Sequence, residues 1–377
     1  SLSGMELSYR RSDLIFKRPA GTSRGVLTSK PTWFVRLDID GHGGQGEVSL
    51  IPGLSLDPEE QIGRELDLLA RRLRAEEPIR LRQFLAERGG ADFSDYRSVL
   101  TDIAGILDSW QVSTDGRFPA LRFALEMALL DLLSGGRQEW FASDFTRGEK
   151  RIPVNGLIWM GEAAFMQEQI EAKLAEGYGC LKLKIGAIDF DKECALLAGI
   201  RESFSPQQLE IRVDANGAFS PANAPQRLKR LSQFHLHSIE QPIRQHQWSE
   251  MAALCANSPL AIALDEELIG LGAEQRSAML DAIRPQYIIL KPSLLGGFHY
   301  AGQWIELARE RGIGFWITSA LESNLGLAAI AQWTALYQPT MPQGLGTGQL
   351  YTNNLPSNLA VDGGLLGVSE GHHHHHH

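Results

Sequence analysis

Cysteine and histidine are scarce in this chain, which limits the disulfide- or metal-based architectures that it can adopt. Its 377 residues include 3 cysteines, Cys180, Cys194 and Cys255. They are too few and too widely spaced for a disulfide framework, and none has the close spacing of a zinc site. We therefore expect them to be small apolar members of the core. Of the 11 histidines, six form the run 372–377, which has the form of a purification tag.

Long hydrophobic runs and an excess of basic residues are also missing. No apolar stretch reaches the roughly 18–20 residues that span a bilayer. The amino terminus lacks the layout of a secretory signal, so we expect a cytoplasmic protein with no membrane partner. A net charge of −9 argues against a nucleic-acid partner, which requires a basic surface. The 43% hydrophobic and 21% charged residues are typical of globular proteins, and the length suggests two domains or one large barrel with an appendage.

The first 115 or so residues have the pattern of a small α+β domain. Residues 33–38, and more weakly 7–10, alternate apolar and polar side chains as antiparallel strands do. We expect the run GHGGQG at 41–46 to be a glycine-rich turn, followed by a strand at 47–51. Because a strand and not a helix follows, the run is a poor match to a dinucleotide-binding fingerprint. Helical periodicity then predicts helices over 58–76 and 79–88.

From residue 116 to about 350, and most clearly after 150, short apolar runs alternate with amphipathic helical stretches. The runs begin roughly 22 to 30 residues apart, which is one βα unit per repeat. The spacing favours a (β/α)8-type barrel, although a doubly wound sheet would show the same alternation. The expected strands are 152–154, 181–185, 209–213, 238–239, 260–264, 287–290, 313–318 and, more weakly, 343–346, with helices at 168–175, 191–201, 224–231 and 303–311.

Three acids follow three successive runs, Asp214, Glu240 and Asp265, 26 and 25 residues apart. Neighbouring parallel strands lie about 4.8 Å apart, so these carboxylates should converge at the carboxyl ends of the strands. Three converging carboxylates suit a hard divalent cation such as Mg²⁺. The alternative is that each acid caps a helix or pairs with a nearby basic residue.

Three lysines accompany the acids. Lys182 and Lys184 are two residues apart on one strand and share a face, whereas Lys291 ends a strand that an eight-stranded barrel places on the opposite wall. A buried lysine beside another cation can lose its proton near pH 7 and act as a base. Unless these lysines simply pair with the acids, the set predicts abstraction of an α-proton from a small carboxylate substrate bound to Mg²⁺.

The combined motifs resemble the enolase superfamily, in particular its muconate lactonizing enzyme subgroup. The resemblance covers nearly the whole chain. It implies a modified (β/α)7β barrel over 116–350 and a capping domain over 1–115 that is completed by about 351–370. It also implies one Mg²⁺ held by Asp214, Glu240 and Asp265, with Lys184 as the base and Lys291 as the facing cation. Substrate contacts would come from Lys182, Asn216, Ser319 and Gly346. The motifs are Lys182-Leu183-Lys184, Asp214-Ala215-Asn216, Glu240-Gln241-Pro242, Asp265-Glu266 and Lys291-Pro292.

Within that subgroup, segments 319–326 and 344–348 resemble the o-succinylbenzoate synthase family. This implies dehydration of 2-succinyl-6-hydroxy-2,4-cyclohexadiene-1-carboxylate to 2-succinylbenzoate in menaquinone biosynthesis. N-succinylamino acid racemases and muconate cycloisomerases share the same lysines and acids and stay open as alternatives. The absence of a histidine near strand seven and of a carboxylate at 346–348 argues against mandelate racemases and dipeptide epimerases.

Two readings from other classes are a Schiff-base aldolase and a barrel that only binds ligands. The three acids in register count against the aldolase, and the complete set of charges counts against the inactive barrel. In the cap, segment 21–30 carries Arg24 and Lys30, which we expect to face solvent and not the substrate. The sequence does not indicate an oligomeric state.

Overall fold

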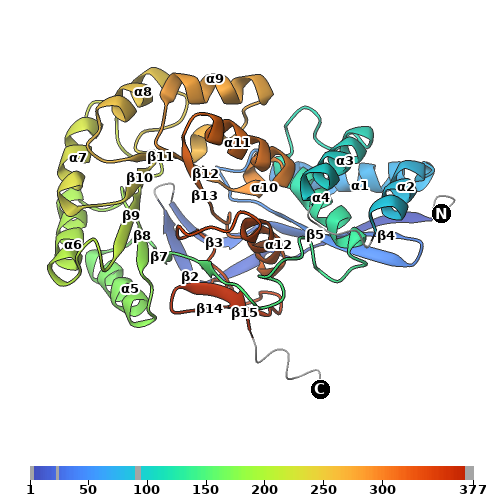
Figure 1. Ribbon diagram of the computed structural model, residues 1–377, viewed down its shortest axis with the longest axis horizontal. Helices are drawn as coiled ribbons and strands as arrows, with labels where there is room; N and C mark the ends of the chain where they lie inside the picture. The colour runs from blue at the N-terminus through green and yellow to red at the C-terminus, as the bar shows by residue number, and fades with distance from the viewer. Residues whose placement is uncertain (1–3, 23–24, 90–94, 370–377) are drawn as a thin grey trace.

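The computed structural model describes residues 4–22, 25–89 and 95–369. The amino-terminal part holds a three-stranded antiparallel sheet in the order β1-β4-β5, formed by β1 (Met5–Arg11), β4 (Thr32–Ile39) and β5 (His42–Ser49). An antiparallel hairpin, β2 (Leu14–Thr22) with β3 (Gly25–Lys30), forms a second, two-stranded sheet. Figure 1 shows the sheet and its helices beside the curved sheet that follows in the chain.

Three helices accompany the amino-terminal sheet: α1 (Glu59–Ala75), α2 (Ile79–Arg88) and α3 (Tyr96–Ser109). Helix α1 buries one face, Ile62, Leu66, Leu69 and Leu73, at the spacing of successive helical turns. Its opposite face is charged, so the helix lies on β1 and keeps its polar side in solvent. The helices expected at 58–76 and 79–88 are confirmed, and the expected α+β character of this region with them.

Helix α4 (Pro119–Leu133) is buried along its whole length, against β5 on one side and α10 (Pro292–Leu295) on another. The glycine run 41–46, expected to be a turn, lies mostly in strand β5, and the turn is confined to Asp40 and Gly41. The reason is close packing: a Cβ on Gly44 or Gly46 would lie about 2 Å from a carbonyl oxygen of α4. Glycine is required here by a helix that packs directly on the strand backbone.

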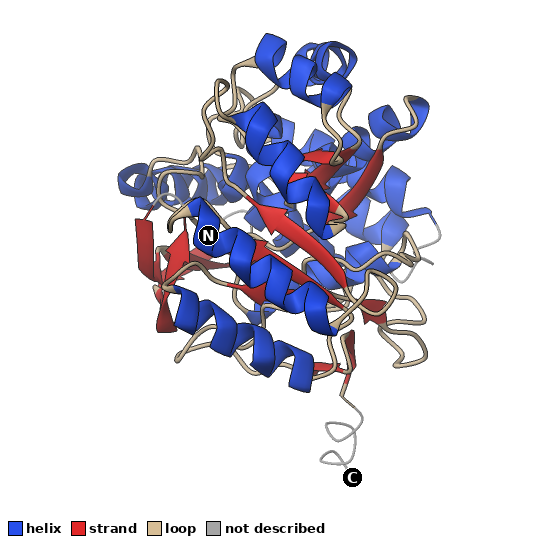
Figure 2. Ribbon diagram, turned by 90° about the vertical axis from the view of Figure 1, so that its left-hand side faces the viewer, coloured by secondary structure: helices blue, strands red, loops and turns tan. Residues whose placement is uncertain are grey.

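The second part is a barrel of parallel strands with helices on its outside, as Figures 1 and 2 show. Seven strands pair in sequence order from β7 to β13. They are β7 (Gly156–Ile158), β8 (Cys180–Lys184), β9 (Glu210–Asp214), β10 (Ser238–Glu240), β11 (Ile262–Leu264), β12 (Tyr287–Leu290) and β13 (Gly314–Ile317). The outer helices are α5 (Ala163–Ala175), α6 (Phe190–Ser203), α7 (Ala224–Leu231), α8 (Trp248–Asn257), α9 (Ala273–Ile283), α11 (Phe298–Glu310) and α12 (Asn324–Ala335), with short 3-10 turns η2 (Ser232–Phe234) and η3 (Glu266–Leu268).

The eighth strand is reduced to two residues, and they close the barrel. Gly344 bridges Thr318 beyond β13, and Gln343 bridges Val154 just before β7, both in the parallel sense. Backbone hydrogen bonds join this segment to Ile317 and Ser319 on one side and to Pro153 and Asn155 on the other. The modified (β/α)7β barrel is therefore confirmed, and the doubly wound sheet is excluded because the sheet closes on itself.

The carboxyl-terminal segment contacts two different parts of the molecule. Residues 350–352 join the β2–β3 hairpin through backbone hydrogen bonds to Ile15 and Lys17. By contrast, β14 (Leu359–Asp362) and β15 (Leu365–Val368) pair with β6 (Ile152–Pro153), which precedes the barrel. Among the described residues, the first part of the segment expected to complete the cap thus joins the amino-terminal hairpin, and its last part pairs with β6. In the described part of the chain, no helix has the length and apolarity needed to cross a bilayer.

Candidate active site

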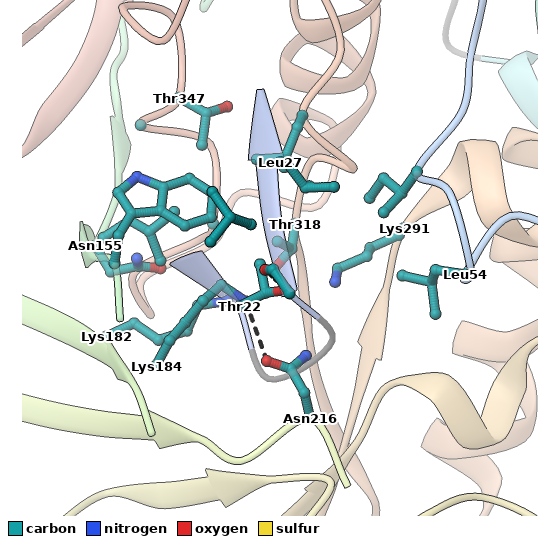
Figure 3. A pocket seen from close by; sticks show the side chains of 18 of the residues that line it. Thr22, Leu27, Leu54, Asn155, Lys182, Lys184, Asn216, Lys291, Thr318 and Thr347 are labelled. Carbon is teal, nitrogen blue, oxygen red and sulfur yellow. Dashed lines mark hydrogen bonds between the residues drawn. The ribbon is translucent and has the colours of Figure 1, made fainter. Parts of the chain in front are cut away.

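A cavity of about 220 Å³ lies at the carboxyl ends of the barrel strands, beneath the β2–β3 hairpin. One side is apolar and includes cap residues, and the other side consists of barrel side chains. Figure 3 shows Lys182 and Lys184 on one side of this cavity and Lys291 on the other. The lining residues that matter for the chemistry are Thr22, Leu27, Leu54, Asn155, Leu157, Trp159, Lys182, Lys184, Asn216, Lys291, Thr318, Leu321, Gly346 and Thr347.

The three predicted acids occupy equivalent places on three neighbouring strands. Asp214 ends β9 and Glu240 ends β10, and the two are direct partners in the parallel register. Asp265 follows the last residue of β11, the next strand. All three carboxylates are buried, with Asp214 and Glu240 fully inaccessible. The sequence prediction that these acids lie on adjacent strand ends is therefore confirmed.

Each of these carboxylates faces one of the predicted lysines. Lys184 Nζ lies 3.1 Å from Asp214 Oδ2, Lys182 Nζ lies 3.4 Å from Glu240 Oε2, and Lys291 Nζ lies 2.7 Å from Asp265 Oδ2. Strands β9, β10 and β11 separate β8 from β12, so Lys184 and Lys291 project from different walls. The lysine–acid pairing considered as an alternative is present, and in it ammonium groups balance the buried negative charge.

The charged groups of the site differ in whether they change protonation near neutral pH. Although burial opposes it, Lys184, Lys182 and Lys291 together lower the pKa of Asp214 to about 2. Burial raises the pKa of Glu240 to about 7, against the attraction of Lys182. Lys291 is buried too, but Asp265, Glu266 and Asp214 raise its pKa above the ordinary value of a lysine. Lys291 is thus a firmly protonated cation at neutral pH.

Glu240 forms an ion pair with Lys182, but its carboxylate has no hydrogen-bond donor among the described residues. Neither of its oxygens accepts a hydrogen bond from the described residues, although both are fully buried. A buried carboxylate in this condition is costly unless a cation or donor contacts it. Within the described ranges, however, no three Asp, Glu, His or Cys side chains already converge as a ligand set for a metal ion. The donor set is chemically suited to a hard divalent cation, but the lysines now contact the same oxygens.

The remaining predicted contact residues are placed as follows. Asn216 lines the cavity, with its Oδ1 3.4 Å from Lys184 Nζ and its Nδ2 donating to Glu266. Gly346 lines the cavity two residues after strand eight. Ser319 does not itself line the cavity; its hydroxyl lies 2.8 Å from that of Thr347, which does.

Two further polar residues of the cavity wall were not predicted from the sequence. Asn155 and Thr318 are both more than nine-tenths buried, and Asn155 Oδ1 and Thr318 Oγ1 have no hydrogen-bond partner among the described residues. Leu157 of β7 lines the cavity, as do Asn155 and Trp159, which directly precede and follow this strand, so every second residue faces the cavity. The sequence shows these residues at alternate positions, but it does not mark them as site residues, because none of them is charged.

The expectation that Lys30 faces solvent is wrong. Lys30 is fully buried, and its ammonium donates to the carbonyl oxygens of Ala320 and Leu321 on the loop after β13. The segment 21–30 is not an open loop, because its described residues belong to the β2–β3 hairpin. Arg24, the other residue of that expectation, lies outside the described residues.

Comparisons with known proteins agree with this geometry. The family model described as "Enolase C-terminal domain-like" matches residues 165–372. A solved structure of MenC from Desulfotalea psychrophila LSv54 is similar over 97% of this chain and 100% of its own, with 97% identity and a TM-score of 0.91.

Among curated sequences, an N-succinylamino acid racemase from Amycolatopsis sp is 30% identical over 66% of each chain. An o-succinylbenzoate synthase from Enterococcus faecalis is 32% identical over 58% of this chain and 57% of its own. The aligned part thus spans about two thirds or less of these relatives' lengths. On the family match and the barrel geometry together, the chain belongs to the enolase C-terminal domain-like family, within the enolase superfamily.

Proposed function

We propose that this protein is an o-succinylbenzoate synthase, a carbon–oxygen lyase of menaquinone biosynthesis. It would dehydrate 2-succinyl-6-hydroxy-2,4-cyclohexadiene-1-carboxylate to 2-succinylbenzoate. The observation that carries the proposal is the pair of buried amines, Lys184 and Lys291, on opposite walls of one cavity with three strand-end carboxylates between them. The 97% identity to MenC and the similarity to o-succinylbenzoate synthases support it.

In this proposal Lys184 removes the α-proton. The electron pair of the broken C–H bond is first delocalised onto the substrate carboxylate as an enediolate, and it then forms the new ring C=C bond as the C–O bond to the hydroxyl breaks. Lys184 then returns its proton to the departing hydroxide, which leaves as water, so the lysine ends the cycle neutral. Lys291, which its acidic neighbours keep protonated, supplies fixed positive charge on the opposite face as negative charge develops on the substrate.

We assign Asp214, Glu240 and Asp265 as the residues that would hold one Mg²⁺ ion. Such an ion supplies positive charge next to the substrate carboxylate when bound. The assignment is supported by Glu240, whose buried oxygens accept no hydrogen bond from the described residues. Asp214→Asn is expected to lower Mg²⁺ affinity at least tenfold in calorimetry, and unchanged metal binding would contradict Asp214 as a ligand. Glu250→Gln, an exposed position on α8, is the matched control.

N-succinylamino acid racemisation is the second candidate, favoured by the similarity to the Amycolatopsis racemase. Racemisation requires both lysines to exchange protons, one on each face of the carbon. The strongly acidic surroundings of Lys291 favour a permanently charged residue there, which suits dehydration better. The MenC match favours dehydration as well.

The experiment that tests the proposal is incubation of the protein and Mg²⁺ with the cyclohexadiene substrate, with aromatisation followed by absorbance. We expect rapid, Mg²⁺-dependent product formation. In parallel, N-succinylamino acids are incubated in deuterated water, and α-deuterium uptake is measured by mass spectrometry. Deuterium uptake without aromatisation would replace the proposed activity by racemisation.

A further inference from the structure

One buried lysine of the cap, Lys30, has no part in the proposed reaction. Lys30 is the last residue of β3 and has no accessible surface. Its ammonium donates to the backbone oxygens of Ala320 and Leu321, the latter at 2.9 Å. These acceptors belong to residues 319–323, here called the β13 loop, which is almost 300 residues away in sequence.

The β13 loop forms part of the cavity wall and has an unusual backbone. Leu321 lines the cavity, and its φ of 62° is in the left-handed region that bulky side chains rarely adopt. Its carbonyl oxygen also accepts a hydrogen bond from the hydroxyl of Tyr351, at 2.5 Å. The surrounding structure must hold such a residue in place, because the isolated chain would favour another conformation.

The same contacts attach the β2–β3 hairpin to the β13 loop. The β2–β3 hairpin has its own small apolar cluster of Leu14, Phe16, Ala20 and Tyr351, against which Leu27 and Leu321 pack. Leu27 is three residues before Lys30 on the same strand and lines the cavity. The hairpin and the β13 loop therefore present Leu27 and Leu321 to the cavity as one apolar wall.

Acidic residues around Lys30 keep its charge. Glu47 on β5 accepts hydrogen bonds from Ser323 N, at 2.8 Å, and from Gly326 N, at 3.0 Å, and so anchors the far end of the β13 loop. Glu322 accepts from the hydroxyl of Ser293 and the amide of Ala320. Burial lowers the pKa of Lys30 to about 8; Glu322 and Glu47 oppose the shift and Lys291 adds to it, and the ammonium stays largely protonated at neutral pH.

We propose that Lys30 is a positioning residue that docks the β2–β3 hairpin on the β13 loop and thereby sets the apolar wall of the substrate cavity. It contacts backbone oxygens of the loop and acts on the substrate only through Leu321 and Leu27. The inference that it affects turnover depends on the proposed function, whereas its docking role does not.

The test compares Lys30→Met with Lys17→Met, which removes an exposed lysine from the same hairpin. We expect Lys30→Met to raise KM for the dehydration at least tenfold while kcat stays within about threefold, because Lys184 and Lys291 are untouched. Hydrogen–deuterium exchange should accelerate at least tenfold in 25–30 and 319–323 but not in β8 or β12. Lys17→Met should match the wild type in both measurements.

Several outcomes would overturn the proposal. They are exchange in Lys30→Met that equals the control, exchange that rises equally through the whole chain, or a loss confined to kcat. If Lys30→Met does not fold, the same exchange measurement is made on Tyr351→Phe, because this variant removes the second hydrogen-bond donor to the Leu321 oxygen. That variant must then show the same localised exchange, and its absence would refute the docking role. Wild-type protein without dehydratase activity would refute the proposed function alone, because the exchange measurement is independent of turnover.

Discussion

Lys184 and Lys291 lie at the same cavity, but their surroundings differ. Lys291 contacts Asp265 at 2.7 Å, and three acids together raise its pKa despite its burial. Lys184 contacts Asp214, a carboxylate that also interacts electrostatically with Lys182 and Lys291. Its other neighbours are Asn216 and the ring of Trp159. A lysine held so strongly in its charged form is a poor proton acceptor. We therefore propose Lys184, and not Lys291, as the base.

Replacing Lys184 with alanine should reduce the dehydration rate by roughly 10²–10⁴-fold, since a positioned general base contributes about that much. The absorbance assay measures the loss, and circular dichroism checks that the fold is kept. Lys192→Ala, an exposed lysine on α6, is the matched control and should be fully active. Activity of Lys184→Ala within about tenfold of the wild type, a barrier change near ~1.4 kcal/mol, would exclude Lys184 as the base.

Asn155 is expected to hydrogen-bond the substrate, because its buried Oδ1 has no partner among the described residues and its side chain lines the cavity. Asn155→Ala should raise KM by roughly tenfold, near ~1.4 kcal/mol, with a smaller effect on kcat. Steady-state kinetics measures the split. Asn257→Ala, an exposed asparagine on α8, serves as the control. An unchanged KM in Asn155→Ala would show that this amide does not contact the substrate.

At the residue scale, the sequence predicted the charged part of the site together with Asn216 and Gly346, but not Asn155, Thr318 or the apolar wall. Lys184, Asp214 and Glu240 are conspicuous because each is a charge inside or directly after an apolar strand. Lys30 lies in a polar segment, where a lysine is unremarkable. Its burial depends on contact with residues 320 and 321, and no local pattern encodes a contact over that separation.

At the scale of elements, strand β5 and helix α4 approach so closely that backbone contacts replace side-chain packing. A Cβ at position 46 would lie 2.0 Å from the carbonyl oxygen of Ala124. The composition of the run 41–46 predicted a turn because glycine usually marks one. A strand made of glycines cannot be predicted locally, since its cause is a helix some 80 residues further along the chain.

Gly46→Ala should therefore destabilise the protein by roughly 1–3 kcal/mol, the usual cost of overpacking a core. Urea denaturation followed by circular dichroism measures the change. Gly199 provides the opposite case, because it lies exposed within α6 and a Cβ there would meet nothing within 4 Å. Gly199→Ala should stabilise the protein by up to ~1 kcal/mol. Equal effects of the two substitutions would contradict this account of the glycine run.

Repeating βα units predicted the barrel well because each strand is a short apolar run. Strand eight was the weakest of these predictions, and it is also the least regular strand in the structure. It is bonded to both neighbours at Gln343 and Gly344 only, and the Gln343 side chain takes part by accepting from Ile317 N at 2.7 Å. Two residues are too few to produce a recognisable hydrophobic run.

For the molecule as a whole, buried carboxylates that anchor helix ends link stability to pH. Glu126 on α4 accepts hydrogen bonds from the amides of Phe298 and His299 at the start of α11. Burial raises the pKa of Glu126 from 4.5 to about 7, against the opposing effect of these hydrogen bonds. The folded state thus holds a proton that the unfolded state releases. This contribution to stability is complete below pH 4.5 and is lost as the pH rises through 7.

Comparison with Glu126→Gln, which cannot titrate, isolates this effect. The free energy of unfolding of the wild type, relative to that of Glu126→Gln, should fall by roughly 2 kcal/mol between pH 5 and pH 8. Urea midpoints for both proteins at the two pH values give the difference. A difference that stays constant with pH would mean that Glu126 is ionised in the folded state throughout this range.

The hairpin over the cavity is stabilised by a core of its own. Its cluster of Leu14, Phe16, Ala20 and Tyr351 is separate from the main core that the barrel and the amino-terminal sheet share. Lifting the hairpin away would break its contacts with Trp159, with the Ala320 and Leu321 oxygens and with residues 350–352, but none of the ion pairs between the lysines and the acids below. We therefore expect the hairpin to separate from the barrel at a lower cost in free energy than global unfolding, which would give ligands a route to the cavity on this side.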